Sequence, residues 1–525
     1  MLWSFQSLSL ELEQDESSLP FILAERLQVP PASILQLKIV RRSIDARRKQ
    51  RILRVYSLEF QLQLSPDQCR RVETLPGVER KAVPAPLRPA AIAAAKQRVV
   101  VVGMGPAGLF AALELARCGH QVILIERGRP VEQRVQDVEA FWRGGPLLAD
   151  SNVQFGEGGA GTFSDGKLTT RIRHPLTQQV LQTLVDCGAP ADILIQAKPH
   201  VGTDRLRQVL VKLRQQLLKL GVELRYDQRL SGLALRDGRA ASVVINQQGE
   251  LDCDALVLAT GHSARDTYQL LSDCGLELEP KPFAMGVRVE HPARQINRIQ
   301  YGMDGHRNLP AADYALTWND PHSGRGVYSF CMCPGGQVVL SSSEAGGVVV
   351  NGMSDFSRDA FYSNSALVVA VRPEDFYRGS ALDGMWFQRH WEQRAYGGDD
   401  YRPPAQNLLD FLGRGGGSVA GSCRPGVREA DLREFLPDFV YTGLQQALPH
   451  FERRMRGFIC REAVLVAPET RTSAPLRIVR TDLLHATRCR NLYPAGEGAG
   501  YAGGIMSAAL DGLKVAQAVH ESARF

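Results

Sequence analysis

The chain has 525 residues, which is enough for two or three domains, and its 44% hydrophobic and 22% charged residues are ordinary for a soluble globular protein. The formal net charge of +6 is small at this length and does not by itself indicate a nucleic-acid-binding protein. No apolar run reaches the roughly 18 residues of a membrane span, and the acidic N-terminal segment lacks a signal-peptide pattern. Ten scattered cysteines without a CxxC spacing favour free thiols and a cytoplasmic location.

Residues 1–85 are predicted to form a small α+β domain, with a ferredoxin-like arrangement as one candidate. Alternation predicts strands at 8–12, 34–40 and 51–62, and helical spacing follows Ser65, an expected N-cap. A segment rich in proline and alanine, 83–96, is predicted to be a linker.

The segment 38–54 within this region carries eight Lys and Arg residues against one acid, Asp45. It could be an anion or RNA surface, or a basic hairpin that is solvated or docked on the larger domain. The second reading is favoured because no aromatic side chains are interleaved for stacking on bases.

A dinucleotide-binding pattern follows the linker. QRVVVV at 97–102 predicts a buried strand, GMGPAG at 103–108 a tight turn, and the residues from Phe110 a helix. A second strand ends at Glu126, 18 residues after Gly108, where its carboxylate can bond ribose hydroxyls. Backbone N–H groups at the helix start suit a pyrophosphate. The predicted cofactor contacts here are Gly103, Gly105, Pro106, Ala107, Gly108, Glu126 and Arg127.

Two later segments fit the same nucleotide. The glycine- and serine-rich run 150–168 is of the kind that covers the pyrophosphate and ring of FAD, and LVLATGH at 256–262 predicts a strand that crosses near the nucleotide. A helix at 208–221 and a β-meander from 222 are also predicted. The expected cofactor contacts in these segments are Gly158, Gly159, Ser164, Gly166 and Gly261.

The segment 491–519 predicts a strand, a glycine loop and a helix from about Ile505. A helix start there would stabilise the negative charge of a reduced flavin, and Glu497 would bond a ribityl hydroxyl or, through water, a phosphate. The alternative is a glycine turn that only packs a helix on a sheet. The expected contacts are Gly496, Glu497, Gly503, Gly504 and Ile505.

With these motifs the chain resembles a bacterial family of uncharacterised FAD-dependent dehydrogenases with a glutathione-reductase-like FAD domain. The resemblance rests also on five further blocks: RRSIDARRK (41–49), FAMGVRVEHP (283–292), QYG (300–302), YSFCMCPGGQVV (328–339) and ETRTSAPLRI (469–478). One departure is Glu497, which stands where Asp is commoner in the wider class. It implies non-covalently bound FAD and leaves the substrate open.

The predicted fold class is α/β, a Rossmann-like FAD-binding domain with an inserted β-rich α+β substrate domain and a small N-terminal α+β domain. The expected boundaries are 97–280 and 456–525 for the two parts of the FAD-binding domain and 281–455 for the insertion. No second GxGxxG unit occurs in 281–455, so a dedicated NAD(P) domain is not expected.

Five residues are candidates for catalysis. Cys331 and Cys333 would share one strand face, either as a redox pair facing flavin or as small buried hydrophobes, which is favoured. Arg288 and Glu290 would share another face, as substrate contacts or as a surface ion pair. Arg471 could fork to a substrate carboxylate or phosphate.

The sequence therefore predicts an FAD-dependent oxidoreductase that transfers hydride between flavin N5 and an unidentified small molecule, which could be anionic, without a metal. Two alternatives stay open: a hydroxylase that takes hydride from NAD(P)H, and a non-catalytic flavin-bearing module that binds RNA or protein through 38–54. The electron donor or acceptor is not specified, and neither nucleic acid nor a membrane is expected as a partner.

Overall fold

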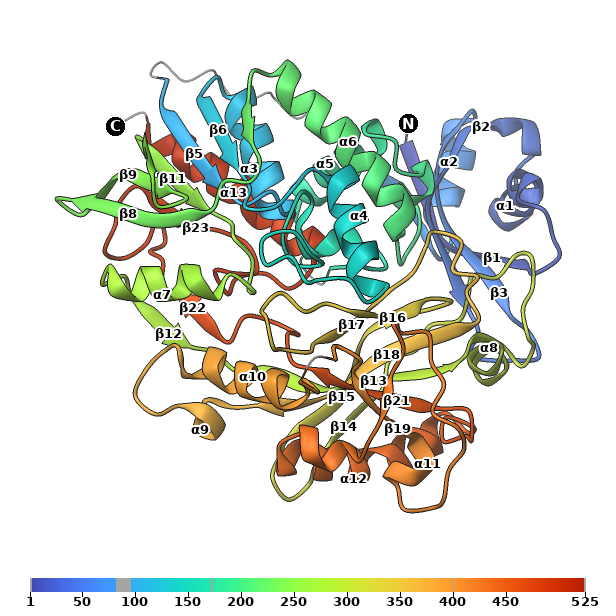
Figure 1. Ribbon diagram of the computed structural model, residues 1–525. Helices are drawn as coiled ribbons and strands as arrows, with labels where there is room; N and C mark the ends of the chain where they lie inside the picture. The colour runs from blue at the N-terminus through green and yellow to red at the C-terminus, as the bar shows by residue number, and fades with distance from the viewer. Residues whose placement is uncertain (1, 82–95, 171, 173, 399, 524–525) are drawn as a thin grey trace.

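The computed structural model describes residues 2–81, 96–170, 172, 174–398 and 400–523 (Figure 1). The predicted linker 83–96 lies outside the described residues except for Lys96. In these ranges, no helix has both the length and the apolar character needed to cross a membrane.

A parallel five-stranded sheet forms the centre of the upper part in Figure 1, in the order β23-β11-β5-β6-β7. Apart from the edge strand at 223–225, its short strands are rich in apolar residues and buried on both faces, as parallel strands are. The strands are β5 (Arg98–Val102), β6 (Gln121–Ile125), β7 (Glu223–Arg225), β11 (Ala255–Leu258) and β23 (Leu492–Pro494). This is the predicted Rossmann-like sheet.

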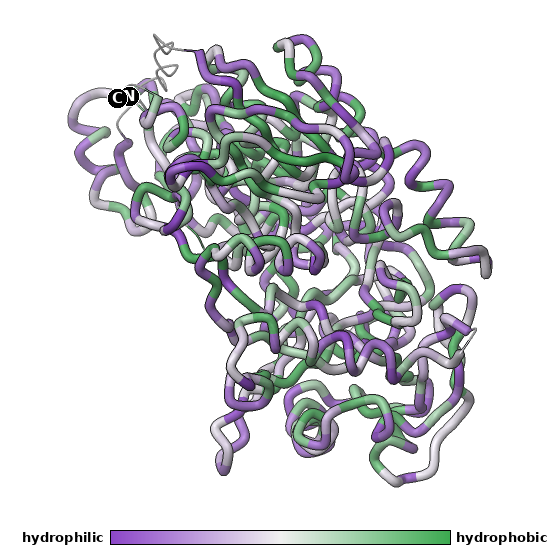
Figure 2. Tube along the Cα trace, turned by 60° about the vertical axis from the view of Figure 1, so that its left-hand side comes forward, coloured by the Kyte–Doolittle hydropathy of each residue, from purple (hydrophilic) through white to green (hydrophobic). Residues whose placement is uncertain are grey.

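Different layers cover the two faces of this sheet. Alternate strand residues pack on helices on one side, and the residues between them pack on a small antiparallel sheet on the other. The helical layer is α3 (Pro106–Arg117), α5 (Leu176–Asp186), α6 (Thr203–Lys219) and α13 (Ile505–Ser522), with α4 (Val131–Trp142) beside α6. The opposite layer is β8 (Leu230–Arg236), β9 (Arg239–Ile245), β10 (Gly249–Asp252) and α7 (Arg265–Asp273). Figure 2 shows hydrophobic segments running through the interior of this part.

Helix α3 begins at Pro106 and not at the predicted Phe110. Proline is well suited to the first helical turn because its φ is already helical and the missing N–H would have no partner there. Gly105 is the N-cap, so the helix starts directly at the glycine turn.

A seven-stranded sheet, in the order β14-β15-β18-β13-β21-β19-β20, organises the lower part of the molecule. Its strands are β13 (Phe283–Pro292), β14 (Thr317–Asn319), β15 (Gly326–Cys333), β18 (Tyr362–Val371), β19 (Pro404–Asn407), β20 (Arg428–Glu429) and β21 (Val464–Glu469). The predicted boundary at 455 is too early, because β21 pairs with both β13 and β19.

The remaining elements of this part surround the sheet. Two pairs of strands, β16 with β17 and β12 with β22, lie toward the parallel-sheet part. The elements are β12 (Leu278–Pro280), α8 (Ala293–Tyr301), β16 (Gln337–Leu340), β17 (Val350–Met353), α9 (Pro373–Phe376), α10 (Asp383–Arg394), α11 (Leu408–Phe411), α12 (Asp438–Arg454) and β22 (Leu476–Ile478). Short 3₁₀ turns elsewhere are η1 (Glu16–Ser18), η2 (Pro31–Ser33), η3 (Gly159–Phe163), η4 (Ala191–Leu194) and η5 (Leu432–Phe435).

The N-terminal residues form an antiparallel sheet, β2-β3-β1-β4, in the ferredoxin-like order. The elements are β1 (Leu2–Glu11), α1 (Leu19–Leu27), β2 (Ile34–Asp45), β3 (Leu53–Leu62), α2 (Pro66–Glu73) and β4 (Val78–Lys81). Ser65 caps α2 as predicted, in a capping box with Gln68.

The basic segment 38–54 is held against the large part of the molecule at Arg42. The Arg42 N–H donates to the Ile195 carbonyl at 2.6 Å, and the Arg42 carbonyl accepts from Ala197 N–H at 2.8 Å. Its guanidinium pairs with Glu16 and Asp192. Arg42 therefore attaches the basic segment to the large part of the molecule, while residues 47–49 at the hairpin tip are exposed.

Candidate functional site

A cavity of about 400 Å³ lies where the carboxyl ends of the parallel strands meet the lower sheet. Ligands of open parallel sheets bind at this edge. Most of the predicted cofactor residues line the cavity: Gly103, Gly105, Pro106, Ala107, Glu126, Arg127, Gly159, Ser164, Gly166, Gly261, Glu497, Gly503, Gly504 and Ile505. Among the catalytic candidates, Cys331 and Arg471 line it as well.

The glycines of the first turn have two different roles. A Cβ on Gly103 would lie 2.4 Å from the Ala259 carbonyl oxygen, and one on Gly108 would lie 1.9 Å from the Gly103 oxygen. A Cβ on Gly105 would meet only Gly159 Cα, at 4.0 Å. Gly108 thus lets the turn close on itself and Gly103 lets it pack against the segment after β11, whereas Gly105 leaves open space in front of the first turn of α3.

The glycines that do not line the cavity pack elements together. A Cβ on Gly496 would lie 2.7 Å from Ala107 Cβ, and one on Gly158 would lie 2.2 Å from Thr162 Oγ1. Gly512, which the sequence analysis missed, lets α13 approach α3, because its Cβ would lie 2.1 Å from the Ala107 oxygen.

Two helices begin at the cavity without a side-chain cap. Gly105 at α3 and Gly504 at α13 are the N-cap residues, and neither provides a side-chain acceptor. A Cβ on Gly503 or Gly504 would meet nothing within 4 Å. The first N–H groups of these helices therefore form two positive ends that suit an anionic ligand.

Glu126 holds the turn together in addition to lining the cavity. Its carboxylate accepts the N–H groups of Met104 at 2.8 Å, Gly128 at 3.0 Å and Gly156 at 2.9 Å. Neighbouring Arg127 lies 4.3 Å over the Phe155 ring and donates to Asp266. The carboxylate thus fixes both the glycine turn and the loop opposite it.

The loop 150–163 is organised by a buried arginine that the sequence analysis missed. Arg134 on α4 donates to the carbonyls of Asn152 at 2.8 Å, Val153 at 2.9 Å and Glu157 at 2.7 Å. Burial lowers the pKa of Arg134 to about 9. One guanidinium thus replaces the regular hydrogen bonds that this irregular loop lacks.

Glu497 and His262 face each other across the cavity wall, with Nε2 and Oε1 3.8 Å apart. Burial raises the pKa of Glu497 to about 7 and lowers that of His262 to about 3. His262 is therefore neutral near pH 7, whereas the carboxyl group of Glu497 is partly protonated at that pH. The sequence analysis included His262 in its strand motif but did not select it.

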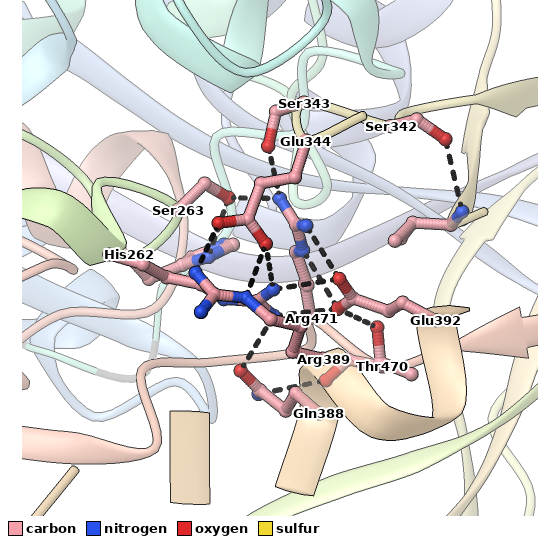
Figure 3. Close-up of polar contacts among 12 residues, drawn as sticks. His262, Ser263, Ser342, Ser343, Glu344, Gln388, Arg389, Glu392, Thr470 and Arg471 are labelled. Atoms are coloured by element: carbon pink, nitrogen blue, oxygen red, sulfur yellow. Dashed lines mark hydrogen bonds and ion pairs between the residues drawn. The ribbon is translucent and has the colours of Figure 1, made fainter. Parts of the chain in front are cut away.

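Arg471 lies in a buried network of ion pairs rather than as an open fork (Figure 3). Its guanidinium pairs with Glu392 at 3.0 and 2.7 Å and donates to the Ser263 and Ser343 hydroxyls. Arg265 binds the other side of Glu392 and also Glu344, which pairs with Arg389. The guanidinium predicted to receive a substrate anion already holds a carboxylate of the protein.

Arg288 and Glu290 are buried, so the surface-ion-pair interpretation is wrong, and neither lines the cavity. Arg288 pairs with Glu469 at 3.0 Å and donates to the Cys331 carbonyl at 2.9 Å. Glu290 accepts the Ser422 N–H at 3.0 Å. Arg288 therefore supports two residues that line the cavity, Cys331 and Glu469.

The two cysteines, predicted to share one strand face, differ in their exposure to the cavity. The pairing of β15 with β18 shifts between Phe330 and Cys333, and Cys331 has a positive φ of 45°. This bulge breaks the alternation of the strand. Cys331 lines the cavity, whereas Cys333 is 0% exposed and lies outside the lining.

Comparison with known proteins gives three family matches and one full-length relative. Residues 98–154 match an FAD binding domain, residues 282–472 a C-terminal domain-like family of FAD-dependent proteins, and residues 6–61 a domain of unknown function. An uncharacterised protein of Clostridium beijerinckii is 44% identical over 536 residues, which cover 98% of each chain. The chain belongs to this family of FAD-dependent proteins.

Solved structures with distant likeness include flavin proteins. A geranylgeranyl bacteriochlorophyll reductase-like protein from Thermoplasma acidophilum is 12% identical, with a TM-score of 0.38, over 81% of this chain and 78% of that chain. The flavin-dependent brominase Bmp2 is 12% identical, with a TM-score of 0.37, over 82% and 80%.

The cofactor of this family member is FAD, and the cavity fits it. The uncapped start of α3 suits the pyrophosphate, and the open space at Gly105 lets it approach the backbone, while the uncapped start of α13 suits the flavin. Glu126 lies at the end of β6, where an acid meets the ribose of a dinucleotide. Gly503, Gly504 and Glu497 would hold the flavin half.

Proposed function

We propose that this protein is an FAD-dependent oxidoreductase that transfers hydride between FAD and a small-molecule substrate. FAD supplies a ring that accepts and donates hydride. The proposal rests on one observation: the cavity that fits FAD is shared with the sheet of the 282–472 segment, through Phe330, Cys331, Asn351 and Glu469.

The chain's own residues support such a reaction in two ways. The lower part forms one side of the cavity, where the partly exposed Phe330, Cys331 and Asn351 provide a wall that a substrate beside the ring can contact. The pKa of Glu497 is raised to about 7, so its carboxyl group can accept or release the proton that accompanies a hydride transfer. The wall also carries Lys167, whose ammonium suits an anionic substrate group.

The RNA-binding module has less support, since Arg42 of the basic segment is engaged with Asp192 and Glu16. The experiment below separates the hydroxylase from the dehydrogenase. We also propose a cytoplasmic location, which the ten free cysteines favour.

The test is anaerobic reduction of the FAD-loaded protein by NADH, NADPH and small hydroxy and amino acids. Reduction is measured as the loss of the absorbance of oxidised flavin. Reduction by one donor, and reoxidation by an added organic acceptor without oxygen, would support a dehydrogenase. Reoxidation only by oxygen, with hydroxylated product, would favour the hydroxylase. Flavin that dithionite reduces but no donor or acceptor affects would overturn the proposal. A flavin-free Gly105→Asp variant controls for reaction away from the cofactor.

A further inference from the structure

Arg288 on β13 spends all of its hydrogen-bond donors inside the protein. A guanidinium has five N–H donors. Two of them go to the two oxygens of Glu469. Two more go to the Cys331 carbonyl at 2.9 Å and to Asn364 Oδ1 at 3.1 Å, and the fifth goes to Asn351 Oδ1 at 2.8 Å. Arg288 therefore has no donor left for a ligand, and its role is to hold residues that reach the cavity.

One of the residues that it holds, Asn351 on β17, lines the cavity. The Asn351 side-chain oxygen accepts from Arg288 and also from the Gly352 N–H at 2.7 Å. Because a guanidinium only donates, the oxygen of the amide must be the atom that faces Arg288. The orientation of the amide is therefore determined, and its NH2 group is the part left for the cavity.

The NH2 group of Asn351 is a donor without a partner. None of the hydrogen bonds among the described residues uses it, and it is not one of the buried atoms that lack a partner. The NH2 group of Asn364, which Arg288 holds in the same way, is in contrast buried. Asn351 thus presents an accessible donor whose position is fixed before a ligand arrives, which favours binding of an acceptor.

The surface beside this donor is apolar and carries no net charge. Phe330 lines the same cavity and is 37% exposed, which is unusual for a large apolar side chain inside a protein cavity. The negative charge of Glu469 is compensated by Arg288. Sites for small molecules combine apolar surface with a few fixed polar groups in this way. The residues that fit FAD belong to the parallel-sheet part, whereas Phe330 and Asn351 belong to the lower part, so they suit a ligand beside the ring.

We infer that Asn351 anchors the substrate, that Arg288 is its positioning residue, and that the substrate is a carbonyl compound with an apolar or aromatic body. The carbonyl or carboxylate oxygen would accept the Asn351 N–H, and the apolar body would lie on Phe330. The inference rests on the proposed function, because it assigns the substrate to the same cavity.

The test is titration of the FAD-loaded protein with three probes, acetophenone, benzoate and ethylbenzene, followed by calorimetry and by the change in flavin absorbance. Acetophenone has a neutral carbonyl, benzoate has a carboxylate, and ethylbenzene has the same apolar body without an acceptor. At least one of the two oxygen-bearing probes should bind about tenfold more tightly than ethylbenzene, as expected for one added hydrogen bond. The tighter of the two identifies the form of the carbonyl group.

Asn351→Asp is the decisive variant, because it keeps an oxygen for Arg288 and Gly352 and replaces only the NH2 group. It should abolish the preference over ethylbenzene while ethylbenzene binds as before. Arg288→Lys, which keeps the charge but not the fork, should reduce the same preference. Asn319→Asp is the matched control, since Asn319 is exposed on β14 and does not line the cavity, and it should leave all three affinities unchanged.

Three results would overturn the inference. One is equal binding of all three probes by the unmodified protein, or no binding of any of them. Another is an unchanged preference in Asn351→Asp. The third is loss of FAD from Asn351→Asp, which would assign the amide to the cofactor. The titrations need no turnover, so probes that bind through Asn351 in a protein that no donor reduces would refute the proposed function alone.

Discussion

Substitutions in the buried ion-pair network around Arg471 should destabilise the protein by different amounts, depending on which charge is removed. The network consists of three guanidinium groups, Arg265, Arg389 and Arg471, and two carboxylates, Glu344 and Glu392. Figure 3 labels all of these except Arg265. Arg471→Met leaves two charges of each sign, because Arg265 still binds Glu392 at 2.7 and 2.8 Å. Glu392→Gln instead leaves three guanidinium groups around one carboxylate.

The magnitudes follow from what each variant leaves behind. Arg471→Met loses charge-assisted hydrogen bonds and should lower the free energy of unfolding by about 1.5–3 kcal/mol. Glu392→Gln leaves buried positive charge without compensation and should cost about 3–5 kcal/mol. For a chain of this length that unfolds as one unit, 1 kcal/mol corresponds to roughly 1 °C in Tm.

The assay is thermal unfolding of the FAD-loaded variants, with flavin release followed separately. Arg143→Met is the matched control, because Arg143 is 73% exposed and its pair with Glu139 should contribute less than about 0.5 kcal/mol. If Arg471→Met lowers Tm as much as Glu392→Gln does, the charge-balance reasoning is refuted.

Further variants test the turn, the carboxyl at 497 and the docking of the N-terminal sheet. Gly108→Ala should destabilise the protein by at least about 1–3 kcal/mol because its Cβ meets an oxygen at 1.9 Å, whereas Gly105→Ala should fold normally; equal Tm values would contradict this. Burial raises the pKa of Glu497 from the ordinary glutamate value of 4.5 to about 7. Between these two pH values the folded form therefore binds more protons than the unfolded form, so the contribution of this group to stability falls as the pH rises. Glu497→Gln should therefore gain Tm over wild type at pH 8 and lose that gain at pH 5, and a constant difference would refute the burial argument. Arg42→Ala should speed proteolytic release of the N-terminal segment without loss of FAD, and unchanged cleavage would show that the docking contact is dispensable.

The parts of the site that the sequence predicts well are those determined by short-range geometry. A glycine turn between an apolar strand and a helix presents its N–H groups to a nucleotide phosphate. The sequence therefore predicts most of the cavity-lining residues between Gly103 and Glu126. The ferredoxin-like order of the N-terminal sheet was a candidate for a similar reason, because strand alternation and the Ser65 cap are local signals.

The parts that it misses depend on contacts between distant residues. Arg265 and Glu392 are 127 residues apart, and nothing local marks either as the partner of the other. Glu392 lies on an ordinary helix, and Arg134 has the sequence context of a surface arginine. The bulge at Cys331 arises in the pairing with β18, so strand alternation alone did not predict that only one of the two cysteines lines the cavity.

The network around Glu392 also explains how the two sheets keep one cavity between them. Arg265 belongs to α7, on the parallel-sheet side, and Glu392 to α10, on the lower side, while Arg471 follows β21 and lines the cavity. Salt bridges in such a buried position contribute little net stability compared with apolar packing, but they require one geometry because any displacement leaves a charge unpaired. The position of the wall that faces FAD is therefore set by charge pairing across the junction, and variants of Glu392 should disturb the flavin's spectrum before they unfold either sheet.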